Sequence, residues 1–139
     1  MSAESDRAAV GRANEAFYRA FEAQDLAAME KIWVTRDYAA LVHPAQPLVR
    51  GWPDVRATLA ALFAGSGRIR FVLTDVQVNV RGEAAWVILT EKVHHEDDAL
   101  VAVQATNVFE RIGRAWKLVV HHASPISDEA GEPNTDFLQ

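Results

Sequence analysis

The histidines are the side chains of this sequence best suited to chemistry. There are five: His43 directly precedes a proline, and the others form the adjacent pairs His94–His95 and His121–His122. An imidazole can accept or donate a proton at neutral pH because its unperturbed pKa is about 6.5. Cysteine is absent, which excludes a thiolate nucleophile, and no spacing of histidines fits a known metal site. The sequence therefore favours acid/base chemistry without a metal or another cofactor.

The pair His121–His122 lies near the end of an expected strand, residues 116–124. Neighbouring side chains of a strand point to opposite faces, so both rings cannot enter one pocket unless the strand bulges. Regular alternation places His122 with Trp116, Leu118 and Val120 on a uniformly apolar face. We therefore predict that His122 faces a pocket and that His121 lies near an interface. The alternative for His122 is a core residue whose hydrogen bonds are satisfied.

Two charged residues are further candidates. Arg50 follows a short apolar segment and could hold a carboxylate or a carbonyl group, or form a surface ion pair. Glu91 is expected to be either a buried acid paired with Arg50 or an interface residue. The pair His94–His95 adjoins the acidic run at residues 96–98, which favours a solvated turn.

The elements that must position these residues fall into two halves. Apolar residues recur at helical spacing in residues 4–23 and 53–65, and Asp25 can cap a helix between them. The rest of the chain predicts short strands near residues 38–42 and 48–50, and four long ones: 68–80, 84–94, 100–111 and 116–124. Helices followed by strands predict an α+β fold, with three N-terminal helices packed on a curved, mainly antiparallel sheet.

Length and charge restrict the classes of function. A chain of 139 residues suffices for one domain, which we expect at residues 1–126, followed by a loosely ordered tail at 127–139. The net charge of −5 comes without a basic stripe, so we expect no nucleic-acid partner. No apolar run approaches the ~20 residues that span a bilayer, and the N-terminus has no apolar signal segment. We expect no membrane contact and a cytoplasmic location.

Two expected strands are apolar on both faces, at residues 86–89 and 116–120. Three helices can cover only one face of four long strands. The other face then needs a second layer, which a homodimer packed sheet on sheet would supply. The alternative is a curled, partly exposed sheet.

Several segments, in this order, resemble the NTF2-like superfamily and, within it, the SnoaL-like domains. They are FYRAFEAQDL at residues 17–26, HP at 43–44 with LVRG at 48–51, NVFER at 107–111 and the strand at 116–125. The resemblance implies a cone: a bent sheet around helices, with a deep cavity and dimerisation through the sheet. The family includes ketosteroid isomerase, scytalone dehydratase, polyketide cyclases, limonene epoxide hydrolase and many members that are not enzymes. Such a fold does not by itself define a function.

The resemblance also suggests roles for particular residues. His43 before Pro44 resembles the Asp-Pro pair in which ketosteroid isomerases carry their general base, and Asn107 stands near their protonated aspartic acid. Phe17 stands where those isomerases carry a tyrosine donor, and Tyr18 is expected to point about 100° away from it on a helix. Steroid isomerisation itself is therefore not expected. The residues expected to line the cavity are Phe17, Trp33, Tyr38, Arg50 and Trp52, with core packing as the alternative for the tryptophans and Tyr38.

Two functions remain open from the sequence. In the first, the protein is a cofactor-free isomerase, dehydratase or cyclase for a small apolar carbonyl compound. His43 would move the proton, while Asn107 and His122 would hold the oxygen. In the second, it is a non-catalytic module that binds a ligand or only dimerises. The enzyme requires the His43 imidazole and the Asn107 amide to converge on one accessible cavity.

Overall fold

The computed structural model describes residues 3–65, 67–97 and 99–127. The helices and strands follow one another along the chain as α1 (Ala3–Ala23), α2 (Leu26–Ile32), β1 (Ala40–Val42), β2 (Val49–Arg50), α3 (Trp52–Gly65), β3 (Ile69–Arg81), β4 (Ala84–His95), β5 (Leu100–Ile112) and β6 (Ala115–Pro125). The expected tail at residues 128–139 lies outside the described residues.

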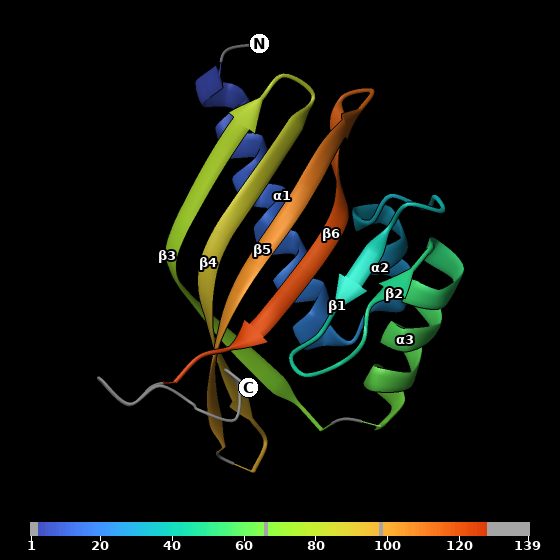
Figure 1. Ribbon diagram of the computed structural model, residues 1–139, viewed down its shortest axis with the longest axis vertical. Helices are drawn as coiled ribbons and strands as arrows, with labels where there is room; N and C mark the ends of the chain where they lie inside the picture. The colour runs from blue at the N-terminus through green and yellow to red at the C-terminus, as the bar shows by residue number, and fades with distance from the viewer. Residues whose placement is uncertain (1–2, 66, 98, 128–139) are drawn as a thin grey trace.

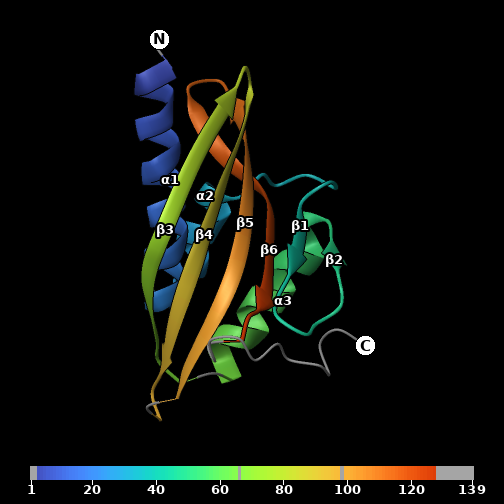
Figure 2. The ribbon, with the colours of Figure 1, turned by 60° about the vertical axis from the view of Figure 1, so that its left-hand side comes forward.

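The strands form one six-stranded sheet in the order β2-β1-β6-β5-β4-β3. The four long strands are joined as an antiparallel meander, and β1 adds to β6 in parallel. Gly82 and Gly113 have φ of +62° in the turns after β3 and β5, a conformation that a side chain would disfavour. In Figure 1, α1 runs behind the long strands, and Figure 2 shows it against one face of the bent sheet. The predicted α+β architecture is confirmed.

Helix α1 buries a broad stripe of its surface against the sheet. Val10, Phe17 and Phe21 are buried at helical spacing, together with the polar residues Asn14 and Tyr18. The C-terminal end of α1 is tied to β3, because the backbone N–H of residue 71 donates to a carboxylate at residue 22 over 2.8 Å. The predicted cap of α2 is also present: residue 28 donates its N–H to the Asp25 side chain.

Strand β6 contains a bulge that changes which histidine faces inward. Val108 pairs with Val120, but the next residue of β5, Phe109, pairs with Leu118, so Val119 is an extra residue. From Val120 onward the side chains alternate again, but each points to the face opposite to the one that an unbroken strand would give it. His121 is therefore buried at 3% exposure.

The prediction that His122 faces the pocket is wrong, because His122 is exposed. The face assignment assumed an unbroken strand, and the extra residue reverses it.

The other face of the sheet carries exposed apolar side chains, including Val72 and Ile88. This agrees with the apolar pattern on both faces of the strands. The homodimer inferred from that pattern stays a prediction. Among the helices of the described residues, none combines the length and apolar character needed to cross a membrane.

Candidate functional site

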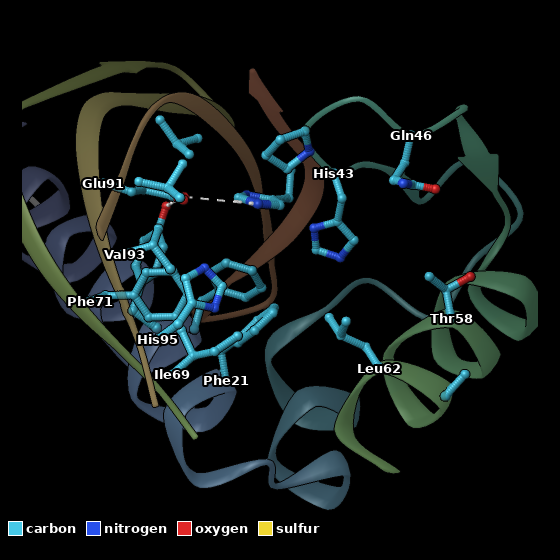
Figure 3. A pocket seen from close by; sticks show the side chains of 17 residues that line it. Phe21, His43, Gln46, Thr58, Leu62, Ile69, Phe71, Glu91, Val93 and His95 are labelled. Carbon is cyan, nitrogen blue, oxygen red and sulfur yellow. Dashed lines mark hydrogen bonds and ion pairs between the residues drawn. The ribbon is translucent and has the colours of Figure 1, made fainter. Parts of the chain in front are cut away.

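A cavity of about 590 Å³ opens between the inner face of the sheet, helices α1 and α3, and the loop after β1. In Figure 3 the His43 ring stands between Glu91 on the sheet side and Gln46 and Thr58 on the side of α3. The full lining comprises Phe17, Tyr18, Phe21, His43, Pro44, Gln46, Thr58, Ala61, Leu62, Ile69, Phe71, Glu91, Val93, His95, Val101, Val103 and His121.

Of the residues predicted for the site, the structure brings His43 and Phe17 to this lining. Trp33 and Trp52 are buried elsewhere, with ring centroids 6.3 Å apart, so for these two core packing is the correct alternative. Tyr38 is exposed and donates its hydroxyl proton to Glu110.

Arg50 does not reach the cavity either. It is exposed on β2 and lines a separate shallow depression with residues 48, 49, 54, 57 and 58. Its predicted pairing with Glu91 is wrong, because Glu91 has other partners inside the cavity.

Sequence reasoning did not assign Tyr18, Glu91 and His121 to the cavity. Tyr18 was expected to point away from Phe17 because the two are neighbours on a helix. The cavity is nevertheless wide enough that both rings line it. The Tyr18 hydroxyl donates to Glu91 Oε2 over 2.5 Å. Because Asn14 and Tyr18 are four residues apart, they lie on the same helix face and reach the same part of the sheet.

Asn107 connects these side chains from the centre of β5. Its Nδ2 donates to Asn14 Oδ1 over 2.8 Å and to Tyr18 Oη over 3.0 Å, while its Oδ1 lies 2.6 Å from His121 Nδ1. Asn107 is fully buried and is not part of the lining. Both of its amide protons already donate to other side chains, so the prediction that Asn107 holds a ligand oxygen is wrong. It instead orients His121, its partner across the β5–β6 ladder.

Burial shifts the protonation of the acid and the base at this site in opposite directions. It raises the pKa of Glu91 from 4.5 to about 7, and the hydrogen bond from Tyr18 only partly opposes this. Burial, with smaller contributions from the charges of His43 and His122, lowers the pKa of His121 from 6.5 to about 3. His121 Nε2 and Glu91 Oε2 lie 3.9 Å apart. Because His121 has lost its proton before Glu91 loses its own, this contact is not an ion pair.

His43 has the properties of a neutral base at neutral pH. Burial lowers its pKa below 6.5. Its Nε2 is buried and has no hydrogen-bond partner among the described residues. The ring lies 5.8 Å from that of His121 and 6.0 Å from that of Phe21, measured between centroids. The His43 ring thus lines the cavity with an Nε2 that is unpartnered within the described part of the chain, whereas both amide protons of Asn107 are already used.

The lining excludes some chemistries. Among the described residues it contains no lysine or arginine, so an anionic ligand would meet no cation. The described residues also include no group of three histidines or carboxylates placed to hold a metal ion. What converges in the cavity is one carboxyl group with a raised pKa and two imidazoles with lowered pKa values.

Comparison with known proteins places this chain in a family. The sequence profile of the SnoaL-like domain matches residues 10–128. The chain belongs to the SnoaL-like domain family. A protein from Streptomyces avermitilis, described as a "putative dehydratase from the NTF2-like family", is 36% identical to this SnoaL-like protein. The match covers 91% of this chain and 99% of that one, with a TM-score of 0.85.

Two other relatives of this SnoaL-like protein carry different descriptions. A chain from Thiobacillus denitrificans is named a "putative calcium/calmodulin-dependent protein kinase type II association domain". It is 33% identical, over 83% of this chain and 93% of that one, with a TM-score of 0.77. The F-box protein SKIP8 of Arabidopsis thaliana is 25% identical over 111 residues, which are 80% of this chain. The SnoaL-like chain spans about half the length of that curated relative, 47%.

Proposed function

We propose that this SnoaL-like protein binds a small, neutral, mainly apolar carbonyl compound and catalyses proton transfer on it without a cofactor. One observation carries the proposal: Glu91, His43 and His121 converge on the wall of a mainly apolar cavity. A buried carboxyl group disfavours folding whenever it ionises, so a pocket built only to hold an apolar molecule gains nothing from it. Shifted pKa values in a cleft are typical of sites that move protons.

The cavity supports the neutral, apolar ligand class. Its volume of about 590 Å³ lies in the range of small-molecule pockets. Phe17, Phe21 and Phe71 supply aromatic walls, and aliphatic side chains complete most of the rest. With no cation in the described lining, a free carboxylate or a phosphate would be poorly held.

The chemistry follows from the protonation states. The neutral His43 imidazole takes a proton from the carbon next to the carbonyl group, and the electron pair of that C–H bond forms a C=C bond. The neutral form of Glu91 donates its proton to the carbonyl oxygen, which gives the enol. In a β,γ-unsaturated ketone the His43 imidazolium then gives its proton to the γ-carbon, while the enol O–H returns its proton to Glu91, which completes an isomerisation. In a β-hydroxy carbonyl compound, Glu91 instead protonates the departing hydroxyl group, the C–O bond breaks and water leaves. His121 Nε2 lies 3.9 Å from Glu91 and stays unprotonated, so it adds a neutral polar atom beside the carboxyl group.

Dehydration is the version of this reaction that we favour. The 36% identical relative is described as a "putative dehydratase", and an acid with a pKa near 7 suits protonation of a leaving hydroxyl group. Glu91 takes the oxygen-binding role that the sequence analysis gave to Asn107 and His122.

A non-catalytic binding module is the second candidate. Its support is that Asn107 has no free amide proton for a developing oxyanion. A relative at 33% identity is also named an "association domain". In this case ligands would bind in the cavity without being altered.

We also propose that two copies pair through the exposed face of the sheet. Val72 and Ile88 lie on that face, and each is at least 37% exposed. Sedimentation equilibrium tests this: a dimer that Ile88→Lys converts to a monomer supports the pairing, and a monomeric wild type contradicts it.

Isotope exchange tests the catalytic proposal without knowledge of the natural substrate. Cyclohexanone is incubated with the protein in D₂O, and NMR follows the loss of its α-protons. A β-hydroxycyclohexanone is tested in parallel for release of the conjugated enone. We expect acceleration by the wild type and a loss of about 100-fold or more in His43→Asn and in Glu91→Gln.

Lys92→Gln is the matched control, because Lys92 is the exposed neighbour of Glu91 on β4 and faces away from the cavity. It should exchange protons at the wild-type rate. Ketone binding without exchange in any variant would support the binding module instead. Equal rates in wild type and Glu91→Gln would contradict the proposed roles.

A further inference from the structure

The buried asparagines next to the cavity have a role that their burial alone does not explain. Asn14 and Asn107 are 3% and 0% exposed, so neither can contact a ligand. Both nevertheless belong to a chain of hydrogen bonds that ends at a cavity side chain, His121. A neutral imidazole carries one proton on either Nδ1 or Nε2, and the partner of one nitrogen determines which form is present.

Donor and acceptor arithmetic fixes the arrangement. Asn107 Nδ2 has two protons and two acceptors, Asn14 Oδ1 at 2.8 Å and Tyr18 Oη at 3.0 Å. That leaves the Asn107 carbonyl oxygen facing His121 Nδ1 at 2.6 Å. A carbonyl oxygen only accepts, so Nδ1 must carry the imidazole proton and Nε2 must carry the lone pair.

We propose that Asn14 and Asn107 are positioning residues that hold His121 as the Nδ1–H tautomer, with the basic Nε2 directed at Glu91 in the cavity. Asn14 acts on His121 through Asn107. The oxygen of Asn14 determines which end of the Asn107 amide faces β6. Asn107 then determines which nitrogen of His121 carries the proton.

The reverse arrangement is possible for these residue types but conflicts with the geometry. If the Asn107 amide were turned over, its NH₂ group would donate to His121 Nδ1 and its oxygen would lie between Asn14 and Tyr18. Tyr18 would then have to donate to Asn107 and give up its 2.5 Å donation to Glu91. Asn14 would also have to turn its own amide over, so that its NH₂ group faces the oxygen of Asn107. The other tautomer therefore requires two further changes in the network.

This inference rests on the proposed function in one respect only, the role of the His121 Nε2 lone pair beside Glu91 during proton transfer. With Nε2 unprotonated, His121 presents a lone pair on the side of Glu91, 3.9 Å from Oε2, whereas the other tautomer would present an N–H donor there. The burial that lowers the pKa of His121 keeps the ring neutral, so the tautomer is defined across the neutral pH range.

Nitrogen NMR of ¹⁵N-histidine-labelled protein tests the proposal directly. At about pH 8, where imidazoles are neutral, the two ring nitrogens of each tautomer give distinct shifts and proton couplings. The His121 resonance is assigned by its loss in His121→Gln. We expect Nδ1 of His121 to carry the proton in the wild type. A proton on Nε2 would overturn the proposal, whatever the variants show.

Three variants test the part played by Asn14. Asn14→Leu removes the acceptor at similar volume, and we expect a second His121 population with the proton on Nε2. Asn14→Asp keeps an acceptor oxygen and should retain the single tautomer. Asn79→Leu, the same change on β3 outside the network, should leave the spectrum unchanged. An unaltered His121 tautomer in folded Asn14→Leu would show that Asn14 does not position it.

The spectrum is independent of turnover, so this proposal and the proposed function can fail separately. If both hold, equal populations of the two tautomers in Asn14→Leu would lower the exchange rate about two-fold, since half the molecules are competent. His43 and His122 serve as internal references, because neither is bonded to the asparagines in this network. If Asn14→Leu does not fold, the wild-type spectrum and Asn14→Asp still decide the tautomer.

Discussion

Replacing Glu91 by glutamine should change how the stability of the protein depends on pH. Glu91 is 4% exposed, and its partner Tyr18 donates to Oε2. A glutamine at this position keeps an oxygen acceptor for Tyr18 and has nearly the same volume, but it cannot ionise. The variant therefore removes the buried acid while leaving the packing almost unchanged.

The sign and size of the change in the free energy of unfolding with pH follow from the raised pKa of Glu91. Between pH 4.5 and about 7 the folded protein keeps a proton that the unfolded chain has released, so raising the pH favours unfolding. The stabilising contribution is complete below pH 4.5 and is lost as the pH rises through about 7. At about 1.4 kcal/mol for each pH unit, the whole change amounts to about 3 kcal/mol.

His121 has the opposite effect in the wild type. Its pKa of about 3 in the folded protein means that the unfolded chain binds the extra proton between pH 3 and 6.5, so stability rises with pH there. The effects of Glu91 and His121 therefore partly cancel in the dependence of wild-type stability on pH. Since His121 is present in both proteins, the difference between wild type and Glu91→Gln isolates Glu91.

Urea unfolding followed by tryptophan fluorescence from about pH 4 to about pH 8 measures that difference. We expect Glu91→Gln to gain about 3 kcal/mol relative to wild type across this range. Glu15→Gln, the same change at an exposed position on α1, should stay within about 0.5 kcal/mol of wild type at each pH. Parallel curves for wild type and Glu91→Gln would refute the raised pKa and, with it, the acid role of Glu91.

Three further predictions concern the network and the strand that carries it. Asn107→Ala should lower the free energy of unfolding by about 3 kcal/mol or more, measured in urea, because it removes three buried hydrogen bonds, those to Asn14, Tyr18 and His121. Tyr18→Phe should raise the pKa of Glu91 above about 7, measured by ¹³C NMR of the carboxyl carbon, because it removes a hydrogen bond that lowers it. Deletion of Val119 should keep His121 buried and unprotonated at about pH 6 in histidine NMR, because it removes only the extra residue of the bulge. An exposed, titrating His121 in that variant would contradict the assignment of the bulge.

The fold was predictable because each local signal agreed with the architecture. Capping by Asp25, the apolar stripe of α1 and the short links between long strands each specify one element independently of tertiary contacts. The order of elements then left few arrangements open.

The site was predictable only where a residue's position follows from its own element. His43 comes directly after β1 and lines the cavity as expected. His121 could not be assigned, because the bulge at Val119 lies in a run of residues that suits a regular strand equally well. Glu91 was expected to be either a buried acid paired with Arg50 or an interface residue, but its actual partners come from α1 and β6, which the sequence does not place near it.

A crystal structure of the protein with cyclohexanone tests the central claim most directly. We expect the ketone inside the cavity, with its oxygen at about 2.6–3.2 Å from the Glu91 carboxyl group and an α-carbon against the His43 ring. A ketone bound only on the outer surface, or lodged in the cavity with its oxygen turned away from both groups, would contradict the account.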